Sequence, residues 1–365
     1  MKKILKKIEI QFRKFFIESI QSNKKPQKIT EPVNIFEQNK KWKILILRQD
    51  RIGDLLISVP LLKILKHNFK KSVIDIILSE KNQSAKQCII DFTNSQYILP
   101  KNLKLFSFLN KLRKKHYDIC IDLFDNSSAT SSFLLKYIKP KYSLGLEKSN
   151  SSIYNYIVPL KNKNDYHIID RISNLLLPFN INPNEQNFEL EYKLPNSAMD
   201  FAEKFFSEIH QNEIKKTIVL GINLSGSSEA KFWGIENNIN LINEINRIYP
   251  EIEVVLFGTK DYLGILKEIE AQTNCRIAPF TRNFDDFAAM IAQCSYLLTP
   301  DTSAVHLAAC FKVPCICLYT ITDGNFGMPW TPYNSPYKML YAKNTTLDQI
   351  PVNSVFEAFK ELYGK

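Results

Sequence analysis

The sequence has little that would build a metal centre, a disulfide framework or a membrane span. Its seven cysteines include no CxxC pair, and its five histidines show no metal-ligand spacing. No run of about 18 apolar residues is present. The basic N-terminus lacks the uninterrupted apolar core of a signal peptide. These absences predict reduced core thiols, no metal, no transmembrane helix and a cytoplasmic location.

Positive charge is concentrated at the start of the chain. The formal net charge is +11, and residues 1–43 carry twelve Lys or Arg against four Glu. The remaining chain is near balance, which argues against a protein that binds nucleic acid.

Residues 1–21 have the pattern of an amphipathic helix. Ile4, Ile8 and Phe12 recur at helical spacing, and basic residues fill much of the rest. We expect this helix to lie on an anionic membrane surface; packing against the protein's own body is the alternative. Residues 22–41 are polar and contain two prolines, which predicts a linker, so 1–41 stands apart from the domains.

Apolar segments alternate with helical segments over the rest of the chain, which predicts an α/β fold with parallel sheets. The stretch 179–196, rich in Asn and Pro, interrupts this alternation. We therefore expect doubly wound domains at 42–185 and 195–365, with a ligand cleft between the carboxyl ends of their strands. The expected strands are 43–47, 73–78, 118–123, 217–222, 252–257, 296–299 and 313–318. The expected helices are 55–68, 103–115, 127–138, 198–209, 237–248, 261–271, 284–293 and 303–311.

The stretch RQDRIGD, residues 48–54, joins a predicted buried strand to a helix. A loop in this place faces the ligand crevice, and Gly53 permits a tight turn and close approach of a ligand. Asp54 lies at the helix N-terminus, where it can serve as an N-cap. A cap leaves Arg48, Asp50 and Arg51 unexplained, so we also consider Asp54 as an acceptor for the proton of a sugar hydroxyl.

The segment after the predicted strand 296–299 has the features of an anion site. Asp301 and Thr302 precede a helix whose free N–H groups and dipole favour an anion. Ser303 can add a hydroxyl donor, and His306 lies one turn further on. The alternatives are an N-cap role for Asp301 or Thr302 and a packed histidine at 306.

A small polar loop, Ser225, Gly226 and Ser227, follows the predicted strand 217–222. Such a loop can wrap phosphates, and Lys231 just beyond it could neutralise a diphosphate. A solvated lysine ahead of an ordinary helix is the alternative.

Together, the segments RQDRIGDLLISVPLLKILK, KFW and TPDTSAVHLAACFKVPCICLY resemble glycosyltransferase family 9, the bacterial heptosyltransferases. The resemblance extends from about residue 43 to 345, and DICIDLF at 118–124 adds to it. It implies a GT-B fold, with two Rossmann-like domains facing across a cleft. It also implies an inverting, metal-independent transfer without a cofactor, from a nucleotide sugar such as ADP-heptose. The implied acceptor is a lipid-linked glycan of the lipopolysaccharide type, at the inner face of the cytoplasmic membrane.

The resemblance also implies roles for individual residues. Asp54 matches the general base of the family, and Lys231 matches its diphosphate lysine. The positions that match donor-binding residues are Ser225, Gly226, Ser227, Asp301, Thr302, Ser303 and His306. The adenine edge would lie near 281–283. The acceptor-side or loop positions are Arg48, Arg51 and Gly53.

Two departures from the family pattern leave the donor open. Gly234 stands where the family often has a proline after the tryptophan, and Thr320 stands where it often has a glycine. A family 9 transferase with another nucleotide sugar, or a non-catalytic GT-B module, therefore remains an alternative. A dinucleotide oxidoreductase is a weaker one, because no GxGxxG follows the first strand.

Other charged residues have structural and functional interpretations. Asp122 and Asp125 form no DxD motif and are interpreted as strand-end structural or acceptor-side residues. The basic segments 111–117 and 136–142 suit a lipid-linked acceptor, with an ordinary solvated surface as the alternative.

Overall fold

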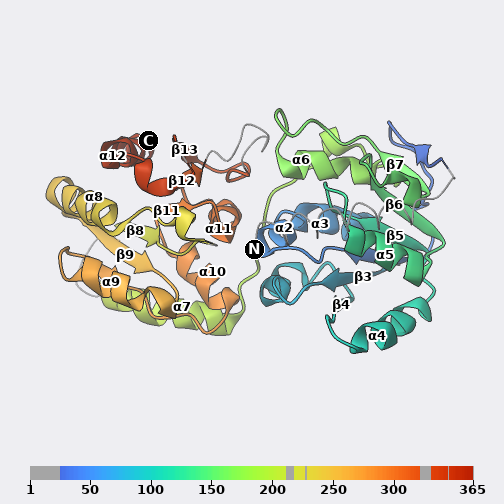
Figure 1. Cartoon of the computed structure of the whole chain (residues 1–365), viewed down its shortest axis with the longest axis horizontal. Helices are drawn as coiled ribbons and strands as arrows, with labels where there is room; N and C mark the ends of the chain where they lie inside the picture. Colours follow the sequence, from blue (N-terminus) through green and yellow to red (C-terminus); the bar gives the residue numbers. More distant parts are fainter. Residues whose placement is uncertain (1–24, 211–217, 227, 321–329, 344, 365) are drawn as a thin grey trace, which may run out of the picture. The chain divides into compact units, whose positions relative to one another are not determined.

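The computed structural model describes residues 25–210, 218–226, 228–320, 330–343 and 345–364. The chain forms two compact units that divide between Phe188 and Glu189, within the predicted boundary stretch. Each unit is built on a parallel sheet with helices packed on it (Figure 1). The helix expected over residues 1–21 lies outside the described residues.

The first unit has a seven-stranded sheet in the order β1-β7-β6-β5-β2-β3-β4. Strand β2 lies inside the sheet, between β5 and β3, and its apolar residues 44–47 are fully buried, as expected where helices cover both faces of a sheet. The strands are β1 (Gln27–Lys28), β2 (Lys43–Leu47), β3 (Val73–Leu78), β4 (Ser95–Ile98), β5 (Ile119–Asp122), β6 (Tyr142–Leu146) and β7 (Tyr156–Val158). The helices are α2 (Ile52–Leu56), α3 (Val59–Asn68), α4 (Lys104–Arg113), α5 (Ala129–Ile138) and α6 (Ile168–Ile172), with short 3-10 helices η1 (Gln83–Ile89), η2 (Ser151–Ile153), η3 (Ser173–Leu176) and η4 (Pro183–Glu185).

Residues 25–41 are an integral part of the first unit, not the predicted linker. Strand β1 pairs with β7 in parallel, and Asn34 forms an isolated antiparallel bridge with Phe179. Phe36 is fully buried, with its ring centroid 5.6 Å from Trp42 and 4.9 Å from Phe179. Burial of this aromatic cluster outweighs the polar, proline-containing sequence around it.

The second unit has a six-stranded sheet in the order β10-β9-β8-β11-β12-β13. The strands are β8 (Ile218–Asn223), β9 (Ile252–Phe257), β10 (Arg276–Ile277), β11 (Tyr296–Pro300), β12 (Cys315–Thr320) and β13 (Tyr337–Ala342). The helices are α7 (Asn196–His210), α8 (Ile235–Ile248), α9 (Leu263–Glu270), α10 (Phe284–Ala292), α11 (Ser303–Phe311) and α12 (Val352–Tyr363), with η5 (Glu229–Lys231), η6 (Lys260–Tyr262) and η7 (Leu347–Gln349).

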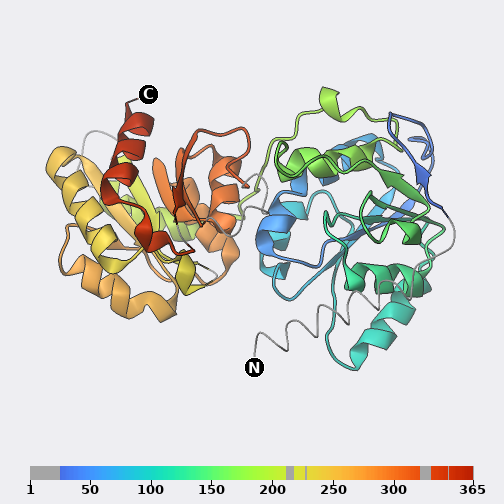
Figure 2. The same cartoon turned by 45° about the horizontal axis from the view of Figure 1, so that its top comes forward.

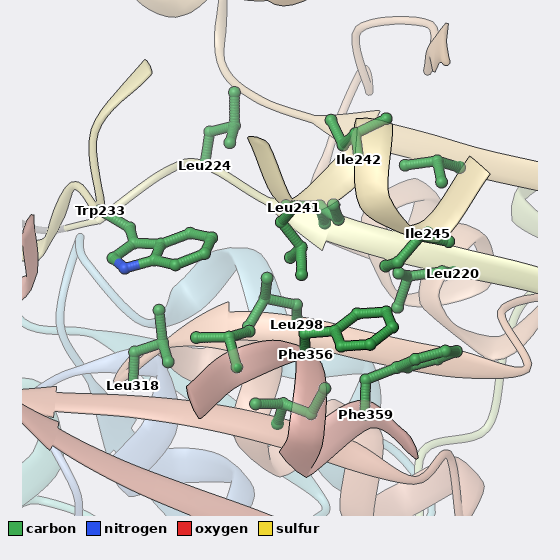
Figure 3. Close-up of a cluster of buried hydrophobic side chains, with 14 of the residues drawn as sticks. Leu220, Leu224, Trp233, Leu241, Ile242, Ile245, Leu298, Leu318, Phe356 and Phe359 are labelled. Carbon is green, nitrogen blue, oxygen red and sulfur yellow. The ribbon is translucent and has the colours of Figure 1, made fainter. Parts of the chain in front are cut away.

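One face of the second sheet carries a large apolar core with Trp233 at one end (Figure 3). Leu298 and Leu318 come from the sheet, and Phe356 comes from α12. The Trp233 indole Nε1 donates to the Ile350 carbonyl at 2.9 Å. The tryptophan therefore anchors the loop that carries Lys231, two residues earlier in the chain.

The other face of this sheet is closely packed around Gly221. A Cβ added to Gly221 would lie 2.7 Å from Cys294 Sγ and 2.8 Å from a Phe257 ring carbon, so only glycine fits between them. Burial raises the pKa of the Cys294 thiol. All seven cysteines are free, and five of them are buried.

Candidate functional site

The sequence-predicted site residues gather at one topological position in each unit. In the first sheet the chain leaves β2 toward β3 and later returns beside β2 with β5, so the strand order reverses between β2 and β5. In the second sheet the same reversal lies between β8 and β11. Ligands bind at the carboxyl ends of strands at such switch points. The residues after these four strands include the candidate site residues.

Arg48 is the centre of the first group of site residues. Only 2% of its surface is exposed. Its Nε donates to the Asp54 carbonyl at 2.7 Å, and its Nη1 donates to the Leu123 carbonyl at 3.0 Å. Asn82, after β3, donates to the Arg48 carbonyl at 2.6 Å. A buried guanidinium held in this way is a fixed positive charge at the switch point.

Asp54 is the third residue of α2, with Arg51 at the N-cap position. Its Oδ2 accepts from the Arg51 backbone N–H at 3.1 Å, which is the capping interaction. Its Oδ1 lies 3.8 Å from Arg48 Nη2, and 14% of the side chain is exposed. Asp54 therefore caps α2 and also presents a carboxylate whose orientation is fixed.

Gly53 does not have the conformation expected of a turn glycine. It is the second residue of α2, and Gly234 is the only glycine with positive φ among the described residues. The chain enters the helix directly from the extended Arg51. The expected tight turn at Gly53 is therefore absent.

Asp50 is the residue that the sequence interpretation left without a role. Its Oδ2 lies 3.1 Å from Arg48 Nη1, so Asp50 and Asp54 share one arginine. Burial raises the pKa of Asp50 to about 7, Arg48 opposes this shift, and Asp54 adds to it. The spacing of Asp50 and Asp54 by four residues was visible in the sequence, but their common contact with Arg48 was not.

Asp122 and Asp125 have structural partners. Asp122 is fully buried, 3.0 Å from Lys148 Nζ, and accepts from the Tyr154 hydroxyl at 2.6 Å. Asp125 pairs with Arg171 at 2.7 Å. These contacts support the strand-end structural interpretation.

In the second unit, the loop after β8 is held by its own polar side chains. The Asn223 amide donates to Thr299 Oγ1 at 3.0 Å, which ties the ends of β8 and β11 together. Ser225 Oγ accepts from the Thr259 backbone N–H at 3.1 Å. Ser227 lies outside the described residues.

Position 226 requires glycine, because Lys231 lies too close to leave room for a side chain. A Cβ built on Gly226 would lie 2.5 Å from Lys231 Cβ and 3.2 Å from the Lys231 carbonyl oxygen. Any side chain here would displace the Lys231 segment. This role in positioning the lysine adds to the predicted phosphate-loop role.

Lys231 and Asp301 form an ion pair across the switch point. The Lys231 Nζ lies 2.7 Å from Asp301 Oδ2 and also donates to the Asp301 carbonyl. The side chains are 19% and 42% exposed, respectively. A cavity beside Lys231, lined in part by Asn223 and Pro300, offers about 10 Å³, enough for roughly one water. A larger ligand would therefore bind on the exposed side of the pair.

The start of α11 presents backbone donors at the same edge. Thr302 is the N-cap, and its Oγ1 accepts from the Ala304 backbone N–H at 3.3 Å. Ser303 is the first helical residue. His306 is only 3% exposed and its ring centroid lies 6.3 Å from that of Trp330. It is thus packed inside the unit, as in the packed-histidine alternative, and its donor-binding role stays a prediction.

The residues expected at an adenine edge have structural contacts of their own. Arg282 pairs with Asp286 at 2.7 Å and lies over the Phe201 ring at 4.9 Å. Asn283 caps α10 by accepting from the Asp286 backbone N–H. These contacts neither require nor prevent a base nearby.

The two groups of residues offer complementary chemistry. The first unit presents a carboxylate that can accept a proton. The second presents an ammonium group and a helix N-terminus that can stabilise developing negative charge. No three His, Cys, Asp or Glu side chains gather as a metal site in the part of the chain that the structure describes.

Comparisons with known proteins agree on one family. The model of glycosyltransferase family 9 (heptosyltransferase) matches residues 105–349. Lipopolysaccharide heptosyltransferase 3 of Escherichia coli K12 is 22% identical over 300 residues, covering 76% of this chain and 83% of the relative.

Solved structures agree with this assignment at the level of the fold. A family 9 glycosyltransferase from Veillonella parvula superposes with a TM-score of 0.74 at 20% identity, covering 90% of this chain and 99% of that one. An E. coli heptosyltransferase solved with ADP-2-deoxy-2-fluoro heptose gives a TM-score of 0.66 at 16% identity, covering 88% and 99%. The two parallel-sheet units therefore have the GT-B fold.

Proposed function

Because this chain belongs to glycosyltransferase family 9, we propose that it transfers a heptose from a nucleotide sugar to a lipopolysaccharide-type acceptor, with inversion. ADP-heptose is the proposed donor. The relatives named as lipopolysaccharide heptosyltransferases support the acceptor class. The E. coli structure with an ADP-heptose analogue supports the donor class.

The observation that carries the proposal is the Asp54 carboxylate fixed beside buried Arg48 at the end of β2. In the proposed mechanism the acceptor hydroxyl attacks the anomeric carbon from the face opposite the diphosphate. Asp54 takes the hydroxyl proton as the new bond forms, an effect of about 10²–10⁴-fold. Arg48 lies 3.8 Å from this carboxylate and keeps it oriented.

The leaving diphosphate gains negative charge as the glycosidic bond to the donor breaks. Lys231 would leave Asp301 to neutralise it, and the N–H groups at the start of α11 would share the charge. Asp301, freed from the lysine, could then accept from a sugar hydroxyl. The exposure of the Lys231–Asp301 pair makes this exchange of partners accessible.

The direct test is calorimetric binding of ADP-heptose, ADP, UDP and GDP, followed by transfer assays with lipopolysaccharide inner-core acceptors. Selective binding of ADP-heptose and ADP, with transfer, is the expected result. Preference for UDP or GDP would contradict ADP-heptose as the donor. It would favour the alternative left open by Thr320, a family 9 transferase for another surface glycan. Binding without transfer to any acceptor would favour a non-catalytic module.

We further propose that the protein works at the inner face of the cytoplasmic membrane as a peripheral protein. Among the described residues, none of the helices has the length and apolar character needed to cross a bilayer. The test is liposome flotation of the full chain and of a chain lacking residues 1–24. The truncation must stop there, because Gln27 already belongs to β1. Equal flotation would count against anchoring by this segment.

A further inference from the structure

Helix α4 of the first unit combines exposed large apolar side chains with unopposed positive charge. Leu103, at its N-cap, is 96% exposed, and Phe106 is 57% exposed. The opposite face of the helix is anchored, since Leu109 and Leu112 are fully buried. Figures 1 and 2 both show α4 at the periphery of the first unit, close to α5. The exposed apolar residues therefore lie on a helix that is already firmly packed.

The charge around this helix has one sign. Residues 101–116 contain six Lys or Arg and no Asp or Glu. Lys101 pairs with Glu80 and Lys115 pairs with Asp75. No described carboxylate lies within ion-pair distance of Lys104, Lys111 or Lys114. Basic residues in the last turn would stabilise the helix dipole, but this explains neither Lys104 at the start nor the exposed apolar pair.

The end of α5 extends the same surface. The Tyr137 hydroxyl donates to Asn110 Oδ1 of α4 at 2.9 Å, and its ring centroid lies 6.2 Å from Phe106. Lys136 and Lys139 flank it and are exposed. A shallow hollow on α4, lined by Ser107, Asn110, Lys111 and Lys114, offers hydroxyl, amide and ammonium donors. Such donors suit the phosphate of a lipid headgroup.

We propose that this α4 surface, formed by Leu103, Lys104, Phe106, Lys111, Lys114, Lys136 and Lys139, binds an anionic lipid bilayer independently of residues 1–24. The two apolar side chains enter the boundary between headgroups and acyl chains, while the lysines reach the phosphates. Charge complementarity selects this occupant, since each lysine near an anionic surface adds attraction. The proposal goes beyond the transferase reaction, because no residue of the α4 surface belongs to the candidate site.

The surface extends from one edge of the sheet toward the other. Leu103 and Lys104 follow the carboxyl end of β4, and Asp54 follows the carboxyl end of β2 in the same parallel sheet. Lys111, Lys114, Lys136 and Lys139 lie at the ends of α4 and α5, which lead back to the amino ends of β5 and β6. Only the start of the α4 surface therefore shares the edge that carries the proposed base.

The test is co-sedimentation of the full chain with vesicles of phosphatidylethanolamine and phosphatidylglycerol, compared with phosphatidylcholine vesicles. The variants are K111E/K114E for charge and L103S/F106S for apolar contact. The matched controls are K204E/K267E and I248S/L263S, exposed positions in the second unit. We expect the charge variant to lose binding to anionic vesicles by at least about tenfold, together with much of the salt dependence. The apolar variant should also lose binding but keep the salt dependence.

Wild-type levels of binding by both α4 variants would overturn the proposal and leave any membrane affinity to other segments. Equal losses in the second-unit controls would also overturn it, because the effect would then be one of net charge. An affinity for phosphatidylcholine equal to that for anionic vesicles would contradict the charge argument. Transfer to a water-soluble acceptor fragment should be unchanged in the α4 variants, so failure of the transferase proposal would be visible separately.

Discussion

The charged groups at the two switch points are held in opposite ways. In the first unit, Arg48 is 2% exposed and is fixed by backbone carbonyls as well as by two carboxylates. In the second, the Lys231 ammonium contacts the carboxylate and carbonyl of Asp301, and the two side chains are 19% and 42% exposed. A proton acceptor benefits from fixed orientation, whereas a group that must meet an arriving diphosphate benefits from a partner it can leave. The rigidity of each group matches the task proposed for it.

The largest expected effect comes from removing the proposed base while keeping the hydrogen bond by which residue 54 caps α2. Asp54→Asn retains an oxygen that can accept from the Arg51 N–H, so α2 should stay formed. We expect the rate of transfer to fall by about 10²–10⁴-fold with donor affinity unchanged. Steady-state kinetics and calorimetry would check this. If Asp54→Asn keeps near wild-type turnover while Asp54→Ala loses it, the residue is a cap and not the base.

The second effect concerns the Lys231–Asp301 ion pair. Lys231→Met removes the ammonium group and should weaken binding of the nucleoside diphosphate by about 10–100-fold. Lys260→Met, at an exposed lysine that begins η6, is the control and should bind normally. Equal affinities of the two variants would remove Lys231 from the donor site.

A third change moves Lys231 without altering it. Gly226→Ala places a methyl group against Lys231 Cβ, so we expect donor affinity to fall about tenfold. Stability of the second unit should fall by about 1–3 kcal/mol. Gly264→Ala, whose added Cβ would meet nothing within 4 Å, should do neither. Calorimetry and urea unfolding would measure both quantities, and identical behaviour of the two variants would contradict the packing argument.

The smallest expected effect concerns Asp50, one of the two carboxylates that contact Arg48. Because the pKa of Asp50 is raised to about 7 in the folded state, the folded protein binds more protons than the unfolded chain between about pH 4 and 7. Stability of the wild type therefore falls as pH rises through this window. Asp50→Asn removes this loss, so its melting temperature relative to wild type should increase from pH 5 to pH 8. A constant difference, as expected for the exposed Asp165→Asn, would show that the Asp50 pKa is ordinary.

Much of the fold was predictable where the sequence is apolar and locally regular. The strands 43–47, 73–78 and 252–257 are confirmed to the residue, because inner parallel strands are mostly apolar, with one charged residue in each of these three. Strands β4 and β13 were not predicted, since edge strands carry polar residues such as Gln96 and Lys338. The predicted helix 55–68 is two helices, α2 and α3, interrupted at Ile57–Ser58.

The candidate site was predictable only in its local parts. The stretches around Asp54, Lys231 and Thr302 stand out because each joins a strand to a helix. The contact of Arg48 with Leu123, 75 residues away, and the pairing of Lys231 with Asp301, 70 residues away, depend on strand order. Burial of Phe36 likewise depends on β7 and Phe179, which is why residues 25–41 resembled a linker.

Gly234 has a consequence for how this chain can be compared with its relatives. Its φ of +105° is closed to proline, whose ring fixes φ near −65°. The proline common at this place in the family is therefore not a simple alternative, because the chain must enter α8 along another path. At this position, an exchange between glycine and proline requires a different path of the backbone.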